Sequence, residues 1–293
     1  MSIAAVYAAL SLPAEVEVDE RVPKKLLLEQ VVLPATDRRL VQDGLEELRF
    51  LATLKPSLCG VAAYRASTTP ASANDIDVLE VVVVSARLRP ATPATTTRLL
   101  ELLHRAIPYP MLLLAETMGP VDDNYSGVIV SLAHKRPAQN AADRLTLLEV
   151  LHSEPLHLVP PSHAAESEAM YQAAGSRPKP VGPAAYLAAL TLPAVGASHL
   201  SALYQSWLDR TVALAAANIT GHYCPPATSV QAAALREALA AHGRLKQEQV
   251  TLRSQATREK QLARRAALNL RLRQLEAELV ALHPILTLTS PIP

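Results

Sequence analysis

The chain has 293 residues, a length that accommodates about two domains of ordinary size. Hydrophobic residues make up 49% of it but aromatic residues only 3%, so leucine, valine and alanine must fill the interior. The two cysteines, Cys59 and Cys224, lie far apart and belong to no CxxC or Cys/His run, which excludes the usual sequence signatures of a disulfide framework and of a zinc site. No stretch approaches about 18 consecutive apolar residues, and we therefore expect a soluble, cytoplasmic protein that does not bind a membrane.

The net charge of +1 hides an uneven distribution of charge along the chain. Residues 228–283 hold 10 Lys and Arg and 5 Asp and Glu, net +5, whereas the remainder holds 18 and 22, net −4. Such asymmetry suggests a partner for the basic segment, either another macromolecule or the acidic body of the same chain.

The N-terminal part predicts alternating helices and strands. Asp37 is placed to cap a helix that continues to about Leu54, because leucines recur at helical spacing until Lys55-Pro56. A strand is predicted over residues 58–64. The run Val81-Val82-Val83-Val84 predicts a strand over residues 77–86 that is buried on both faces.

A strand, helix and strand follow one another over residues 77–116. The helix is predicted over residues 96–105 and the second strand over residues 111–116, an order typical of a parallel pair joined by a right-handed crossover. Further strands are predicted over residues 127–133 and, as one or two short pieces, 145–158. Residues 1–158 therefore predict one α/β domain with a mixed sheet that contains a βαβ unit.

The rest of the chain predicts a connector and an α-helical C-terminal region. Residues 159–195 are rich in Pro and Ala and form the predicted connector. Residues 196–223 predict a helix that packs on the body, with an apolar stripe from Leu200 to Ala215 and an end at Gly221. Residues 228–283 predict one or two long helices, basic and similar to a coiled coil.

The long C-terminal region predicts two surfaces. On one straight helix, five cations fall within an arc of about 40° and extend over about 38 Å: Lys246, Arg253, Lys260, Arg264 and Arg271. Beside them a leucine seam alternates by four and three and predicts a partner interface: Leu268, Leu272, Leu275 and Leu279. The cations are either a solvated flank of a helix pair or a row that contacts nucleic-acid phosphates. The region contains no aromatic residue for base stacking.

Two short clusters at the ends of predicted elements form a candidate anion site: His104 and Arg105, and His134, Lys135 and Arg136. Arg and Lys side chains that meet in space bind phosphate or carboxylate groups. The structural alternative is that His104 and Arg105 stabilise a helix C-terminus through its dipole, before the stiff turn at residues 108–110.

Acidic residues near the predicted strands invite comparison with metal-dependent nucleases: Asp75, Asp77, Glu80 and Glu116, with His134 and Lys135. Thr117 and Met118 follow Glu116, so the Glu-x-Lys pair of such a site is missing. Phosphate loops, a GxGxxG turn, a GxSxG elbow and HExxH are also missing. We therefore predict no catalytic residues, no metal site and no cofactor.

Several segments together resemble a known bacterial family: residues 22–25, 54–57, 104–110, 133–136, 203–209 with 213–221, and 258–269. In that order they are similar to the family labelled domain of unknown function 4391, over nearly the whole chain. The resemblance implies a companion of a helicase and a DNA methyltransferase in restriction-like or phage-defence gene clusters. It brings no catalytic residues with it.

These observations favour a non-enzymatic accessory or adaptor subunit of a DNA restriction or phage-defence complex. Its partners would be a large protein, such as a helicase or methyltransferase, and DNA phosphates contacted by the C-terminal helices. Two alternatives remain open: a diverged metal-dependent nuclease, and a scaffold that assembles with copies of itself through the leucine seam.

Overall fold

The computed structural model describes residues 2–30, 33–66, 76–117, 127–138, 141–156 and 183–288. The chain divides into two compact units, and the division falls between Thr211 and Val212. Helix α9 (Leu200–Thr220) runs through this point, so its first half belongs to an α/β unit and its second half to a helical unit. None of the helices in these residues is long and apolar enough to cross a membrane.

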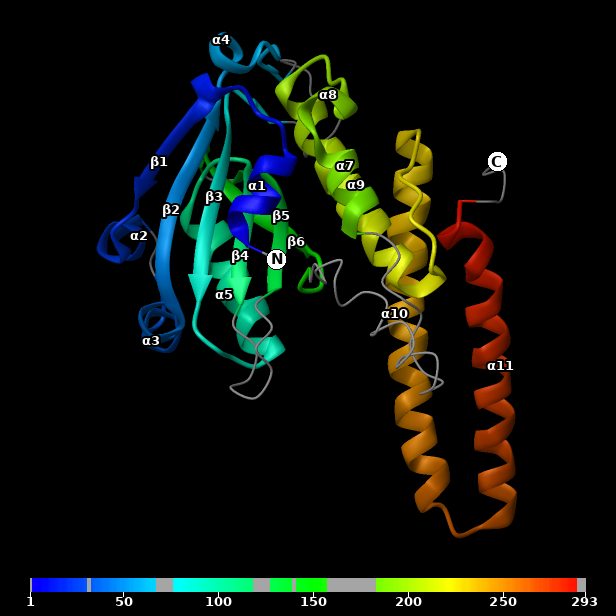
Figure 1. Ribbon diagram of the computed structural model, residues 1–293. Coiled ribbons are helices and arrows are strands. Elements are labelled where there is room, and N and C mark those ends of the chain that lie inside the picture. Colours follow the sequence, from blue (N-terminus) through cyan, green and yellow to red (C-terminus); the bar gives the residue numbers. More distant parts are fainter. Residues whose placement is uncertain are drawn as a thin grey trace, which may run out of the picture. The chain divides into compact units, whose positions relative to one another are not determined.

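The α/β unit is built on a six-stranded sheet whose strands lie side by side in chain order (Figure 1). The strands are β1 (Glu17–Arg21), β2 (Leu45–Leu54), β3 (Val81–Leu88), β4 (Met111–Thr117), β5 (Gly127–Ala138) and β6 (Ala141–His152). Strands β3 and β4 are parallel, and the other neighbouring pairs are antiparallel. Helix α5 (Pro93–Ala106) connects the parallel pair. The mixed sheet and its βαβ unit are thus confirmed.

The remaining helices of the α/β unit lie before, between and after these strands. They are α1 (Ile3–Ala9), the 3-10 turn η1 (Ala14–Val16), α2 (Lys24–Gln30), α3 (Ala35–Gly44), α4 (Pro56–Cys59), α7 (Pro183–Leu190) and α8 (Leu192–Val195). The predicted connector over residues 159–195 lies outside the described residues as far as residue 182. Its last part forms α7 and α8.

The central strands β3 and β4 are buried on both faces, so the side chains that alternate along them are covered on each side of the sheet. Val82, Val84 and Ala86 of β3 join a core with Val41 of α3 and leucines of α5. Val81 and Val83 point to the opposite face and are also fully buried. On that face, Tyr204 of α9 reaches the backbone of β4 and β5. The prediction of a central strand without an exposed side is confirmed.

The prediction of one helix from Asp37 to Leu54 is wrong in its second half. Helix α3 ends at Gly44 and β2 begins at Leu45. β2 contains two irregularities of register, between Leu45 and Glu47 and between Phe50 and Ala52. An extra residue at such a bulge places Leu45 and Leu48 on the same face although they are three residues apart. The three-residue spacing of Leu45 and Leu48, which is also typical of a helix, therefore led to the wrong prediction.

The strand predicted over residues 58–64 is also wrong. Pro56 begins the short helix α4, a position that its fixed φ favours, and Gly60 ends it at φ +71°. Beyond it, within the described residues, single bridges join Ala62 to His199 and Tyr64 to Val78 in place of a strand.

The helical unit contains the end of α9 and two long antiparallel helices, α10 (Ser229–Arg258) and α11 (Leu262–Leu286), seen as a hairpin in Figure 1. Thr228 caps α10 by accepting a hydrogen bond from the N–H of Gln231. The helix ends where Glu259 becomes extended. The prediction of one continuous row of five cations over about 38 Å is therefore wrong, because the chain reverses direction between Arg253 and Arg264.

Candidate interaction surfaces

The leucine seam of α11 lies on the inner side of the hairpin. Leu275 is fully buried, and the other three predicted interface residues are half-buried: Leu268, Leu272 and Leu279. On α10, Gln249 and Ala256 are buried as well, and Gln249 donates a hydrogen bond to Glu276 of α11. In this fold the seam joins α11 to α10 of the same chain.

Two cations of the predicted row form ion pairs across the hairpin. Arg253 lies 3.3 Å from Glu276, and Arg271 lies 3.0 Å from Glu248. Arg271 also lies 2.8 Å from Glu278. Its hydrogen bonds with these two carboxylates raise its pKa. Neighbouring carboxylates thus neutralise both arginines.

The hairpin tip, residues 258–265, presents the densest positive charge of the helical unit. Arg258, Lys260, Arg264 and Arg265 are exposed, and no ion pair to any of them is found within the described residues. Glu259 is the one acid of this segment, and its carboxylate accepts a hydrogen bond from the N–H of Gln261. Because α10 ends and α11 begins here, their dipoles largely offset each other. The positive field therefore comes from the side chains.

A shallow hollow of about 880 Å³ lies behind this tip. Leu252, Ala267 and Leu268 supply apolar surface to it. Its charged lining includes Arg258, Lys260, Arg264 and Arg271. The predicted row of cations contains Lys260 and Arg264 but not Arg258 and Arg265. The local density of basic residues would have revealed both.

The predicted anion site is divided between the interior and the surface. His104 and Lys135 are buried, with 1% and 7% of their surface exposed, whereas Arg105 is exposed. His134 and Arg136 are half-buried on β5. The ammonium of Lys135 donates hydrogen bonds to the backbone carbonyls of Ile107 (2.5 Å) and Tyr109 (2.8 Å). Lys135 therefore holds the turn after α5 against β5.

His104 forms the second polar contact between α5 and β5. Its Nε2 lies 3.0 Å from the hydroxyl of Ser131, which is also buried. Burial, and then the charges of Lys135 and His152, hold the pKa of His104 well below its ordinary value. Burial also lowers the pKa of Lys135 to about 7. Nδ1 of His104 has no hydrogen-bond partner among the described atoms.

The acidic residues proposed for a nuclease do not converge. Glu80 precedes β3 and lies 3.6 Å from Lys55, whereas Glu116 lies near the end of β4, 3.4 Å from Arg87. Since Arg87 and Glu116 are paired in the sheet, about 20 Å of strand separates them from Glu80.

Of the remaining acidic residues considered for a nuclease site, one forms a hydrogen bond with a loop and the other lies outside the described residues. Asp77 accepts a hydrogen bond from the N–H of Ala66, and Asp75 lies outside the described residues. No group of His, Cys, Asp and Glu in the described part of the chain could hold a metal ion.

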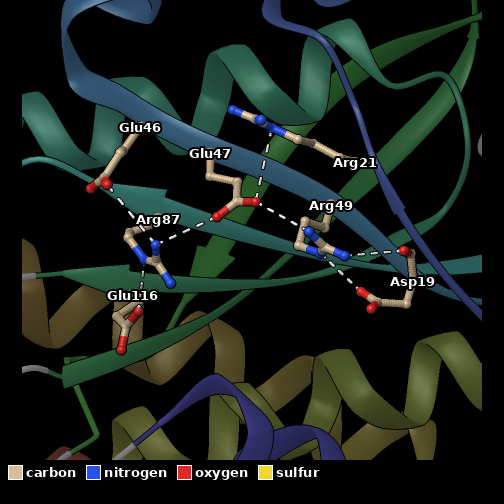
Figure 2. Close-up of polar contacts among 7 residues, drawn as sticks. All are labelled: Asp19, Arg21, Glu46, Glu47, Arg49, Arg87 and Glu116. Atoms are coloured by element: carbon tan, nitrogen blue, oxygen red, sulfur yellow. Dashed lines mark hydrogen bonds and ion pairs between the residues drawn. The ribbon is translucent and has the colours of Figure 1, made fainter.

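Glu116 belongs to an ion-pair network that crosses four strands (Figure 2). Arg87 lies between Glu47 and Glu116, at 3.5 and 3.4 Å. Arg49 lies between Glu47 and Asp19, at 3.2 and 2.9 Å. The network joins β1, β2, β3 and β4 at one end of the sheet and opposes their separation.

Comparison with known proteins places the chain in one family. The family model described as domain of unknown function (DUF4391) matches residues 10–279. No curated protein and no solved structure matched. The match covers nearly the whole chain and includes both the α/β unit and most of the hairpin. The chain therefore belongs to the DUF4391 family.

Proposed function

We propose that this protein is a non-enzymatic adaptor of a bacterial DNA restriction or phage-defence complex, and that the tip of its helical hairpin contacts DNA phosphates. The observation that carries the proposal is the gathering of Arg258, Lys260, Arg264 and Arg265 at the tip without carboxylate partners among the described residues. Elsewhere in the hairpin, Arg253 and Arg271 are neutralised.

Phosphate binding fits the chemistry of the tip. Exposed Lys and Arg side chains gain affinity for a duplex by releasing condensed counterions, and this term does not depend on base sequence. Residues 228–293 contain no Phe, Tyr or Trp, so the usual aromatic platform for base stacking is missing there. The expected mode is non-specific attachment to the phosphate backbone, which positions the adaptor on DNA.

The larger protein partner, a helicase or a DNA methyltransferase, is the part of the proposal that rests on the family resemblance. The leucine seam is not assigned to that partner, because it packs inside the hairpin. We assign the partner contact to the α/β unit, so that this unit and the hairpin tip act on different molecules. Tethering in this form needs no chemical step.

The test is the salt dependence of binding to a duplex of about 20 base pairs, for the full-length protein and a quadruple variant. The variant is R258A/K260A/R264A/R265A. Each lost phosphate contact reduces the slope of log K against log[salt] by about 0.9. Four lost contacts should therefore flatten the slope by about 3 to 4.

The matched control removes the same charge from exposed cations of the α/β unit: Arg38, Arg39, Arg65 and Arg89. The R38A/R39A/R65A/R89A variant should keep a slope close to that of the unmodified protein. Equal slopes for the two variants would contradict the assignment of the phosphate contacts to the hairpin tip. If the full-length protein does not bind the duplex even at low salt, the proposal that it contacts DNA is wrong.

A further inference from the structure

The hollow behind the hairpin tip combines apolar surface with positive charge. Leu252 of α10 and Leu268 of α11 line it together with Ala267. Both leucines are half-buried and Ala267 is exposed, so part of this apolar lining is open to solvent. Phosphate groups gain nothing from apolar surface, because they stay hydrated or pair with cations. The apolar part of the lining therefore fits a different chemical group of a ligand.

The charged part of the lining comes from the end of α10, the turn and α11. Arg258 is the last residue of α10, Lys260 lies in the turn, and Arg264 lies in the first turn of α11. Arg271 lines the hollow as well but is held by carboxylates of the hairpin. Glu259 is the one carboxylate among the lining residues. Four cations and one carboxylate give the lining a net charge of +3, which favours an anion.

An unpaired nucleotide carries both kinds of group that this lining combines. Its phosphate is an anion, and its base has an apolar face. In an intact duplex that face is covered by the neighbouring bases, whereas an unpaired base is free to leave the stack. Guanidinium planes of arginine also stack on bases, so Arg258 and Arg264 provide contacts that aromatic side chains provide elsewhere.

The shallow shape of the hollow favours a strand over a free nucleotide. Sites for small molecules bury most of the surface of their ligand, which a shallow hollow does not do. A nucleotide within a strand is held in addition through its neighbouring phosphates, which the exposed cations of the tip are placed to contact.

We propose that the hollow binds an unpaired nucleotide of a DNA strand whose neighbouring phosphates contact the hairpin tip. The protein then prefers duplex ends with overhangs, and junctions, over an uninterrupted duplex. This inference rests on the proposed contact between the tip and DNA and names the form of DNA that the tip selects.

The experiment compares three forms of a labelled duplex of about 20 base pairs by fluorescence anisotropy at one low salt concentration. The first is blunt, the second has an overhang of five thymidines, and the third has an overhang of five abasic sites. The two overhangs carry the same charge and differ only in their bases. Because leucine replaces an aromatic platform, we expect the thymidine overhang to bind about threefold to tenfold more tightly than the abasic one.

Two variants assign this preference to the hollow. L252S should abolish it and leave the affinity for the abasic overhang unchanged. A267W adds an aromatic side chain at an exposed position, so folding does not depend on it, and it should increase the preference by at least about fivefold. The controls V250S and V250W change an exposed valine that points about 160° away from Leu252 on the same helix. Both should keep the preference of the unmodified protein.

The possible failures can be told apart. Equal affinity for the thymidine and abasic overhangs, or an A267W variant without a greater preference, would overturn this inference and leave the phosphate contacts of the tip in place. If none of the three duplexes binds, the proposed contact with DNA is wrong and this inference fails with it. Tighter binding of a peptide of alternating Leu and Glu, at the same net charge as the overhang, would assign the hollow to a protein segment instead.

Discussion

Arg271 of α11 and Glu248 of α10 form an ion pair across the hairpin, with Nε of the arginine 3.0 Å from Oε1 of the glutamate. Within the described residues, it is one of two ion pairs that join the two helices of the hairpin. Arg271 and Arg253 hold carboxylates of the facing helix, whereas the cations of residues 258–265 face solvent. The account of function depends on that difference.

The Arg271–Glu248 pair should stabilise the hairpin only weakly, because 39% and 42% of the two side chains are exposed. A double-mutant cycle of R271A and E248A should give a coupling free energy below about 1 kcal/mol, measured by urea unfolding. R271A should also change the salt slope of DNA binding less than K260A does. The reverse order would mean that paired cations bind the phosphates.

Leu275 should be a principal apolar contact of the hairpin, since it is the fully buried residue of the seam. L275A should lower the free energy of opening the hairpin by about 2 to 5 kcal/mol. Hydrogen exchange of the α11 amides measures this local opening. V250A, which truncates an exposed side chain of α10, should change it by less than about 0.5 kcal/mol. Similar effects of the two variants would contradict the buried seam.

Tyr204 should hold β4 and β5 together at the point where their ladder ends. Its hydroxyl accepts a hydrogen bond from the N–H of Ala133 and lies within donating distance of the carbonyls of Ala133 and Met111. Burial raises its pKa to about 12. Y204F leaves a buried N–H without a partner and should destabilise the α/β unit by about 1 to 3 kcal/mol in urea unfolding. Y109F, at an exposed tyrosine, should have little effect.

His104 should make the stability of the α/β unit sensitive to acid. Its pKa is lowered in the folded state, chiefly by burial, so below about pH 6.5 the unfolded chain binds a proton that the folded chain does not. The free energy of unfolding should therefore fall as the pH falls below that value, by up to about 1.4 kcal/mol per pH unit. H104Q can still bond Ser131 and should lose this part of the slope. An unchanged pH profile of unfolding in H104Q would contradict the assignment.

The βαβ unit could be predicted from the sequence because each of its elements has the apolar pattern of one kind of secondary structure. A run of valines is typical of a strand buried on both faces, and the leucines of α5 recur at helical spacing. β2 was mistaken for helix because its register irregularities change the spacing of its leucines, and a bulge depends on the neighbouring strand.

The end of α10 could not be predicted from local signals. No Gly or Pro lies between Arg258 and Leu262, so the usual stop signals are missing where the chain turns. Without that turn, the ion pairs of Arg253 and Arg271 with the facing helix could not be foreseen. Likewise, the order of the elements could bring His104 and Lys135 together but could not reveal that both are buried.

Hydrogen exchange of the full-length protein, with and without a short DNA duplex at low salt, tests the central claim most directly. The account predicts slower exchange at residues 258–265 and in the adjoining turns of α10 and α11 when the duplex is bound. Exchange around His104 and Lys135 should be unchanged, since both side chains are buried and already form hydrogen bonds within the protein. Slower exchange at residues 104–105 and 134–136, with none at the hairpin tip, would contradict it.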